Sequence, residues 1–294
     1  MTAAEHGLLL LCCALPGSGE KPLTAAQLQE LEKRARALGP GEADPLRELT
    51  ARDLVRLGYT QEQSARIVRL LAREELLDRY LREGEKNGIY PVTRVSAGYP
   101  VRLRQTLGQR CPAVLFAKGD ARLLSARCIC VVGSRALRQD GRAFAQTAGR
   151  LIAGAGLALC SGGAQGADRA AQDTCLQCGG SAVIFPAGRL LDCEARKDVL
   201  YLAEQAYDAP FSTQRALTRN LFIHAMGEKT LVAQCHNGTG GTWDGTTENL
   251  RRGWSPVFVY DDGSDGARAL IARGAVPVGA HFTLEELEPA QMQF

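Results

Sequence analysis

Three short segments rich in small residues carry the side chains that could do chemistry. Gly133, Ser134 and Arg135 follow one apolar run, residues 161–168 follow a second, and residues 237–248 form a glycine-rich third. A serine hydroxyl donates to an oxyanion, an arginine fork fits a phosphate, and glycine lets the backbone approach a ligand closely. Anionic ligands collect where such loops lead from strands into helices at the carboxyl edge of a sheet. The pattern therefore predicts a phosphate site.

Each of these segments also fits a purely structural role. Gly133 and Ser134 are suited to cap the next helix while Arg135 stays in solvent, and the third segment is suited to a surface loop. Asp168, near the start of a predicted helix, fits a helix-dipole role as well as a ligand contact. What favours a shared pocket is that three such loops are predicted at one edge of a sheet.

No set of residues for nucleophilic or metal chemistry stands out. The four histidines are scattered, and the pair Cys175 and Cys178 has no second pair to complete a zinc site. The ten cysteines lie within predicted strands and helices without regular spacing, which favours free thiols in a reducing cytoplasm. We therefore predict no metal, no cofactor and a cytoplasmic location.

The composition is that of a globular protein. With 294 residues, 45% hydrophobic and 23% charged, the chain can bury a substantial core. Its formal net charge of +3 does not by itself indicate a polyanionic partner. The apolar run at residues 8–15 is too short to cross a bilayer and follows no basic residue, so we predict a buried first helix and no membrane association.

The periodicity of the chain changes near residue 88. Residues 23–88 carry a helical pattern with a break at residues 39–41, which predicts an N-terminal all-α domain over 1–88. The glycine turn in this domain is weakly similar to helix-hairpin-helix or SAM-like modules, and an ordinary helical bundle fits it as well. Residues 89–294 alternate between strands and helices, which predicts an α/β fold with a Rossmann-like, doubly wound and mostly parallel sheet.

The predicted elements of this second domain can be given by their ranges. Strands are expected at 89–93, 113–119, 129–132, 157–160, 182–185, 230–233, 256–259 and 276–278. Helices are expected at 141–155, 167–177, 199–206, 246–252 and 266–273.

Several motifs occur in the order seen in one known family. They are Tyr99-Pro100, the stretch 111–120, Val131-Val132-Gly133-Ser134-Arg135, residues 161–168 and Arg219-Asn220. In this order and spacing, over roughly residues 45–280, the chain resembles the DNA-processing protein A family (DprA, also called Smf). The resemblance implies an extended Rossmann-like domain that binds single-stranded DNA, protects it and helps to load RecA in natural transformation. It also implies a homodimer and no chemical reaction.

The resemblance also assigns phosphate contacts. It implies nucleic-acid binding by Gly133, Ser134, Arg135, Ser161, Gly162, Gly163, Gly166, Lys197, Arg219 and Asn220, with Lys197 or Arg196 the nearest candidate for a basic residue after the third strand. The chain departs from the family pattern at Ala167, Gln172 and Leu221, and it ends without the winged helix that many members carry.

Two alternatives come from other functional classes. The loop around Gly240, Gly241, Gly245 and Thr246 is similar to the phosphate loop of lysine-decarboxylase-like phosphoribohydrolases, although an insertion shifts its register. In such an enzyme Glu248 would be catalytic, with Arg135 or Arg219 holding the phosphate of a nucleotide. The third option is a non-catalytic nucleotide sensor.

Overall fold

The computed structural model describes residues 1–36, 46 and 48–287. Five helices come first: α1 (Ala3–Cys12), α2 (Ala25–Ala35), α3 (Ala51–Arg56), α4 (Gln61–Leu71) and α5 (Glu74–Lys86). The first four begin with a threonine whose hydroxyl accepts the N–H three residues on, while the Glu, Gln or Asp at that position bonds back to the threonine N–H. These reciprocal capping boxes explain where the helices start. The predicted break at residues 39–41 lies outside the described residues.

The leucine run near the amino terminus forms the buried first helix that the sequence predicted. Leu9, Leu10 and Leu11 of α1 are fully buried. They share one hydrophobic cluster with Leu70, Leu77 and residues of the sheet such as Phe116. No described helix is both long and apolar enough to cross a membrane.

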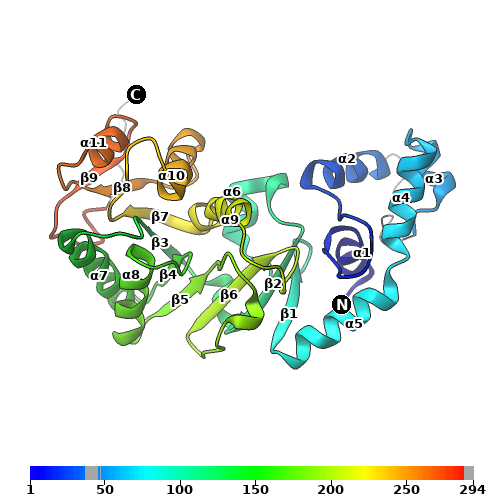
Figure 1. Cartoon of the computed structure of the whole chain (residues 1–294), viewed down its shortest axis with the longest axis horizontal. Coiled ribbons are helices and arrows are strands. Elements are labelled where there is room, and N and C mark those ends of the chain that lie inside the picture. Colours follow the sequence, from blue (N-terminus) through cyan, green and yellow to red (C-terminus); the bar gives the residue numbers. More distant parts are fainter. Residues whose placement is uncertain (37–45, 47, 288–294) are drawn as a thin grey trace.

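A single nine-stranded sheet organises the rest of the chain, with the strand order β1-β2-β6-β5-β4-β3-β7-β8-β9 (Figure 1). The pairs β1–β2 and β2–β6 are antiparallel and all others are parallel. The strands are β1 (Ile89–Thr93), β2 (Val114–Gly119), β3 (Cys128–Val132), β4 (Ala158–Ser161), β5 (Ser181–Ile184), β6 (Val199–Glu204), β7 (Gly227–Val232), β8 (Val257–Tyr260) and β9 (Val276–Val278).

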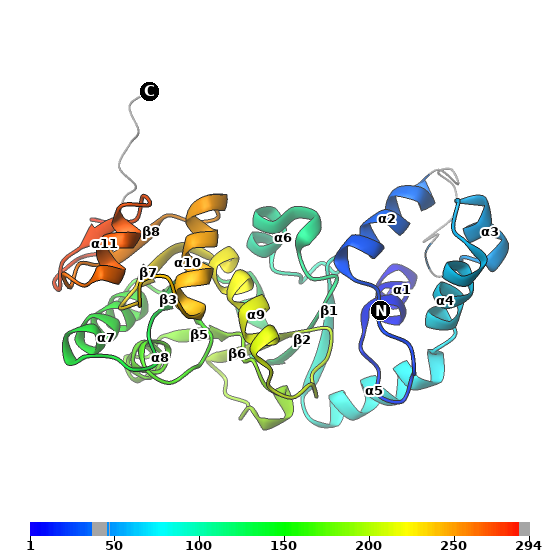
Figure 2. The same cartoon turned by 45° about the horizontal axis from the view of Figure 1, so that its top comes forward.

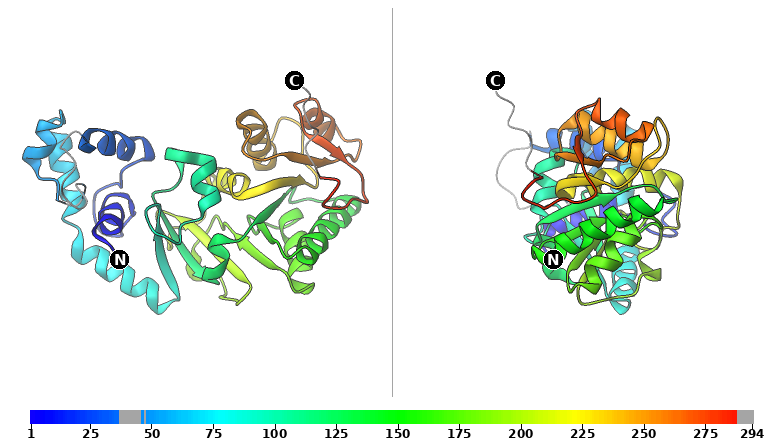
Figure 3. Two further views of the ribbon diagram at one scale, coloured as in Figure 1. Left: turned by 180° about the vertical axis from the view of Figure 1, so that it is seen from behind. Right: turned by 90° about the vertical axis from the view of Figure 1, so that its left-hand side faces the viewer.

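Helices cover both faces of this sheet (Figures 2 and 3). One face carries α7 (Gln139–Gly154) and α8 (Ala167–Gln177) over its middle, and among the N-terminal helices α1 and α5 contact β1, with α1 also reaching β2. The other face carries α6 (Val101–Leu107), α9 (Thr213–Met226), α10 (Gly241–Arg252) and α11 (Asp265–Ile271). Neighbouring residues of β2 alternate between the two clusters, as the two-residue period of a strand requires. The predicted fold class is confirmed.

The direction of winding reverses at β3. From β3 the chain builds β4, β5 and β6 on one side, and it then returns through α9 to place β7, β8 and β9 on the other side. A crevice at the carboxyl edge is expected at such a switch point, because the loops after β3 and β7 diverge to opposite faces. The candidate site lies there.

Several elements differ from the expectation, and one of them is the short helix α6, where no helix was expected. Residues 199–206 form the strand β6 and the turn after it instead of a helix, because they pair with β2 on one side and β5 on the other. The fourteen-residue helix α9 was not anticipated, and Arg219 lies in its interior and not at a helix start. The division into domains at residue 88 stays a prediction, since the helices before it share a continuous core with β1, β2 and β6.

Candidate phosphate-binding site

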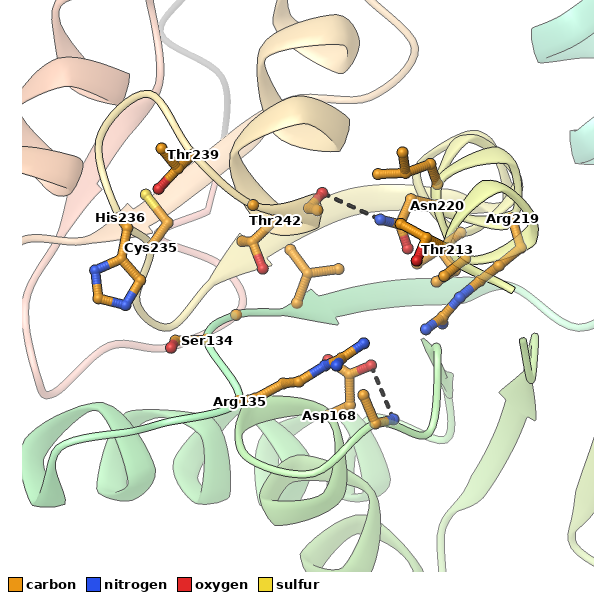
Figure 4. Close-up of a pocket in the computed structure, with 18 of the residues that line it drawn as sticks. Ser134, Arg135, Asp168, Thr213, Arg219, Asn220, Cys235, His236, Thr239 and Thr242 are labelled. Carbon is orange, nitrogen blue, oxygen red and sulfur yellow. Dashed lines mark hydrogen bonds between the residues drawn. The ribbon is translucent and has the colours of Figure 1, made fainter. Parts of the chain in front are cut away.

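A pocket of about 570 Å³ opens at the switch point, between the loops after β3, β4 and β7 and the helix α9 (Figure 4). The loop after β3 contributes Gly133, Ser134 and Arg135, and α9 contributes Arg219 and Asn220. The glycine-rich segment after β7 lines the pocket with Thr239, Gly240, Gly241 and Thr242. The structure thus brings the three predicted loops to one cavity.

Two arginines converge on this pocket without a carboxylate to pair with. Arg135 makes no hydrogen bond or ion pair with any described residue, and Arg219 has buried Nε and Nη1 atoms without a partner. Both guanidinium groups point into the same space (Figure 4). Burial lowers the pKa of Arg219, the nearby Asp168 opposes this effect, and the charge of Arg135 adds to it. Two facing cations of this kind are a ready receptor for an anion.

Asp168 shapes the second loop instead of pairing with either arginine. Its carboxylate accepts the backbone N–H of Gly162 at 3.0 Å and that of Ala164 at 3.4 Å. Burial raises the pKa of Asp168, while Arg219 and these N–H donors oppose the rise. The side chain of Arg219 lies against Gly162, where a Cβ atom would take the position of the guanidinium group. The absence of a side chain at residue 162 therefore makes room for Arg219.

The first two loops interlock at Gly166. This residue has a φ of +86°, and a Cβ there would lie 2.6 Å from the Cα of Arg135. The N–H of Ala167 donates to the Ser134 carbonyl at 3.2 Å. The Ser134 hydroxyl donates to the C=O of Ala136 and accepts its N–H, both at 3.2 Å, so this hydroxyl stabilises its own turn.

Helix starts contribute less to the pocket than the sequence suggested, with one exception. The N–H of Arg138, which caps α7, donates to the Gln234 side chain at 3.0 Å, and Ala167 at the start of α8 bonds to Ser134. Helix α10 differs, because Gly240 precedes it with a φ of +91° and no side chain caps it. Its first residues line the pocket, so its partial positive charge faces the two arginines.

Apolar side chains on the rim were missed by the sequence analysis. Phe211 and Leu217 line the pocket and are 59% and 37% exposed. A base stacked on the Phe211 ring would lie beside the cationic floor. The available signal was an aromatic residue in the polar segment that precedes α9.

A buried polar network closes the inner wall of the pocket. The Asn249 amide nitrogen donates to the hydroxyls of Thr230 (3.3 Å) and Ser255 (3.0 Å) and lies 3.3 Å from Nδ1 of His224. Burial lowers the pKa of His224 to about 4 from its usual 6.5, so the ring is neutral at pH 7. This network orders the wall, and the neutral ring adds no charge to it.

We expect His224 to weaken the fold in acid. The unfolded chain binds a proton near pH 6.5 that the folded chain resists until about pH 4, so stability falls as the pH drops between these values, by about 3 kcal/mol. Glu204 and Asp168, whose pKa values are raised, act in the opposite direction. Denaturant unfolding of the wild type and of His224→Gln at pH 7, 5.5 and 4 isolates the contribution of this histidine to the pH dependence of stability. A stability gap that stays constant with pH would contradict this role.

The other residues that were predicted to bind phosphate do not line this pocket. Ser161, Gly162, Gly163 and Gly166 shape the second loop behind the pocket. Ser161 lies near Gln172, its hydroxyl 3.5 Å from Oε1. Lys197 is exposed just before β6, at the opposite edge of the sheet, so its phosphate contact stays a prediction away from this pocket. The basic residue that follows β5 is Arg189, which pairs with Asp192 at 3.0 Å.

Glu248 does not line the pocket. It lies on α10 and pairs with Arg251 at 2.6 Å and Arg252 at 2.9 Å. These two cations hold its pKa below the usual value. Within the described residues, no cluster of His, Cys, Asp and Glu has the makings of a metal site. The geometry therefore offers an anion-binding cleft without an acid–base pair beside it.

A doubly wound sheet with two arginines in the cleft at its switch point defines the class: a Rossmann-like protein, whose ligands are expected at this edge of the sheet. The sequence model of the family described as DNA recombination-mediator protein A matches residues 91–288. The chain therefore belongs to the DNA recombination-mediator protein A family, the DprA family to which its motifs point. This is a family of DNA-binding proteins and not of enzymes.

Known relatives agree with this assignment. The chain is 27% identical to the DNA processing protein DprA of Bacillus subtilis (strain 168) over 289 residues, which is 92% of this chain and 96% of the relative. The crystal structure of DprA from Streptococcus pneumoniae has the same fold, with a TM-score of 0.73, 23% identity and 95% of each chain covered. A DprA structure from Helicobacter pylori, described by its single-stranded DNA binding mode, covers 67% of this chain and 93% of its own, with a TM-score of 0.55 and 21% identity.

Proposed function

We propose that this DNA-processing protein binds single-stranded DNA at the pocket between β3 and β7, with backbone phosphates held by Arg135 and Arg219. The convergence of two unpaired guanidinium groups on one cleft is the observation that carries this proposal. The uncapped start of α10 adds partial positive charge, and Phe211 offers a face for one base. Stacking of this kind adds about 1–3 kcal/mol per base.

The finer role follows from the family. We propose that the protein protects single strands and helps to load RecA onto them in the cytoplasm during natural transformation, and that it acts as a homodimer. The name of the family, a recombination mediator, supports a role upstream of the recombinase. Sedimentation equilibrium tests the dimer. RecA filament assembly on strands already covered by single-strand-binding protein, with and without this protein, tests the loading.

Fluorescence anisotropy with labelled oligo-dT across a salt series tests the binding site. Each phosphate neutralised on a single strand contributes about 0.7 to the slope of log K against log salt. We expect Arg135→Ala to weaken binding about tenfold and to reduce the slope by about that amount. A duplex of the same length is the reference ligand, and we expect it to bind more weakly than the single strand.

The matched control is Arg150→Ala, which removes another exposed arginine from α7, a helix that does not line the pocket. Its affinity and salt slope should equal those of the wild type. Equal losses in both variants would mean that overall charge, and not this pocket, attracts the strand. If the wild type does not bind at low salt, the proposal fails, and nucleoside phosphates become the ligands to screen for a sensor.

A further inference from the structure

A second cavity, of about 190 Å³, adjoins the phosphate pocket along α9. Arg219 lines both cavities, so a strand whose phosphate contacts Arg219 has the second cavity within reach. The aromatic rings of Phe185 and Phe222, whose centroids are 6.1 Å apart, contribute to its wall. A small planar group suits a cavity of this size and lining better than a second phosphate.

Two opposite charges line this cavity without pairing. Glu204, the last residue of β6, makes no side-chain hydrogen bond or ion pair with any described residue. Arg215 on α9 has a buried Nε atom without a partner and likewise no ion pair among the described residues. The charge of Arg215 nevertheless acts on the Glu204 carboxylate. The two groups are therefore near each other but separated.

The backbone beside Glu204 is strained. Gln205 has a φ of +63°, the only positive value among the described residues other than glycine. Its carbonyl accepts the N–H of Ala14 at 3.1 Å, and this contact with the N-terminal helices holds the turn. Such strain persists where the surrounding structure imposes it, so the turn that follows Glu204 is held in place.

We propose that this second cavity is a base subsite of the same DNA-binding groove and that it selects guanine. The Watson–Crick edge of guanine presents two adjacent donors, N1–H and N2–H, which match the two oxygens of the Glu204 carboxylate. Its O6 atom is an acceptor for the free N–H of Arg215. Thymine and cytosine offer the carboxylate one donor group, and adenine offers one donor group beside an acceptor, so only guanine engages both oxygens side by side.

The state of the carboxylate supports this assignment. Burial raises the pKa of Glu204 to about 7, and Arg215 opposes the rise. The charged or titratable groups around it are Arg215 and Arg219 on α9, Cys12 on α1 and Tyr99. Burial raises the pKa of Cys12 to about 12 and that of Tyr99 well above its usual value, so both stay neutral near pH 7. Guanine selection should therefore be stronger at pH 8 than at pH 6, where the protonated acid has lost one acceptor.

The inference rests on the proposed binding of single-stranded DNA, and its test separates the two. Anisotropy is measured with dT 15-mers that carry one central dG, dA or dC, and with the unmodified dT 15-mer, at pH 6 and pH 8. We expect the dG oligomer to bind about tenfold more tightly than the others at pH 8, because one bidentate pair discriminates by this order. Glu204→Gln should remove the preference and leave the affinity for the dT 15-mer within about twofold.

Two further variants complete the test. Glu194→Gln removes an exposed carboxylate that does not line this cavity and should keep the dG preference. If Glu204→Gln does not fold, Arg215→Gln takes its place as the test variant, and we expect it to lower the preference for dG. Tight dT binding without a dG preference overturns the guanine subsite and leaves the proposed function standing. Failure to bind any oligomer overturns both.

Discussion

Arg219→Met should lower the affinity for oligo-dT at least about 100-fold and should not lower the melting temperature. The Nε and Nη1 atoms of Arg219 are buried and lack partners, so a bound phosphate would supply the acceptors that the fold does not. Charge-assisted hydrogen bonds of this kind contribute about 1.5–3 kcal/mol each. The lowered pKa of Arg219 shows that its charge is unfavourable in the folded protein, so an apolar side chain of similar length relieves that cost.

Anisotropy and thermal unfolding of the same preparations measure both effects. Arg169→Met is the matched control, because it removes an exposed arginine from α8 that pairs with Asp173 only at 3.8 Å. We expect that control to bind as the wild type does. If the affinity of Arg219→Met for oligo-dT stays within about threefold of the wild-type value, Arg219 does not bind the strand.

The second large effect concerns Gly166. An alanine there must adopt a φ near +86°, which costs about 1–3 kcal/mol, and its Cβ meets backbone atoms of Ser134 and Arg135 that cannot rotate away. With overpacking of a further 1–3 kcal/mol, we expect Gly166→Ala to destabilise the protein by about 4 kcal/mol. The same shift displaces Arg135, so affinity should fall as well.

Urea unfolding with a constant m-value measures the stability loss. Gly154→Ala serves as the control, since the last residue of α7 has ordinary dihedral angles and empty space around a Cβ. That variant should be as stable as the wild type or slightly more stable. If both variants have the same stability, the two loops do not depend on each other as the structure indicates.

Local patterns predicted much of the sheet and the three loops. The run at residues 128–132 is apolar throughout and ends at Gly133, which marks a buried parallel strand followed by a turn. Residues 199–206 misled the prediction, because their apolar residues fit a helical period as well as a strand. Only pairing with β2 and β5, which are distant in the sequence, decides between the two.

The contribution of α9 to the pocket, beside the three loops, could not be predicted from local sequence patterns. Arg135 and Arg219 are separated by 84 residues, and nothing in the pattern around Arg219 indicates that α9 crosses the carboxyl edge of β3. The unpaired state of Glu204 and Arg215 is likewise a property of the packed molecule. Sequence showed which residues suit phosphate, whereas the winding of the chain decides which of them meet.

The reversal at β3 also couples ligand binding to the cohesion of the molecule. Arg135 follows β3, whereas Arg219 lies on α9, the helix through which the chain returns, so the two arginines form a receptor only while both segments are folded together. A single strand present at a free concentration of 100 times its Kd would therefore raise the free energy of unfolding by about 2.7 kcal/mol. If the proposed binding holds, a bound strand links the segment after β3 to α9, and we expect the melting temperature of the protein to rise when the strand is present.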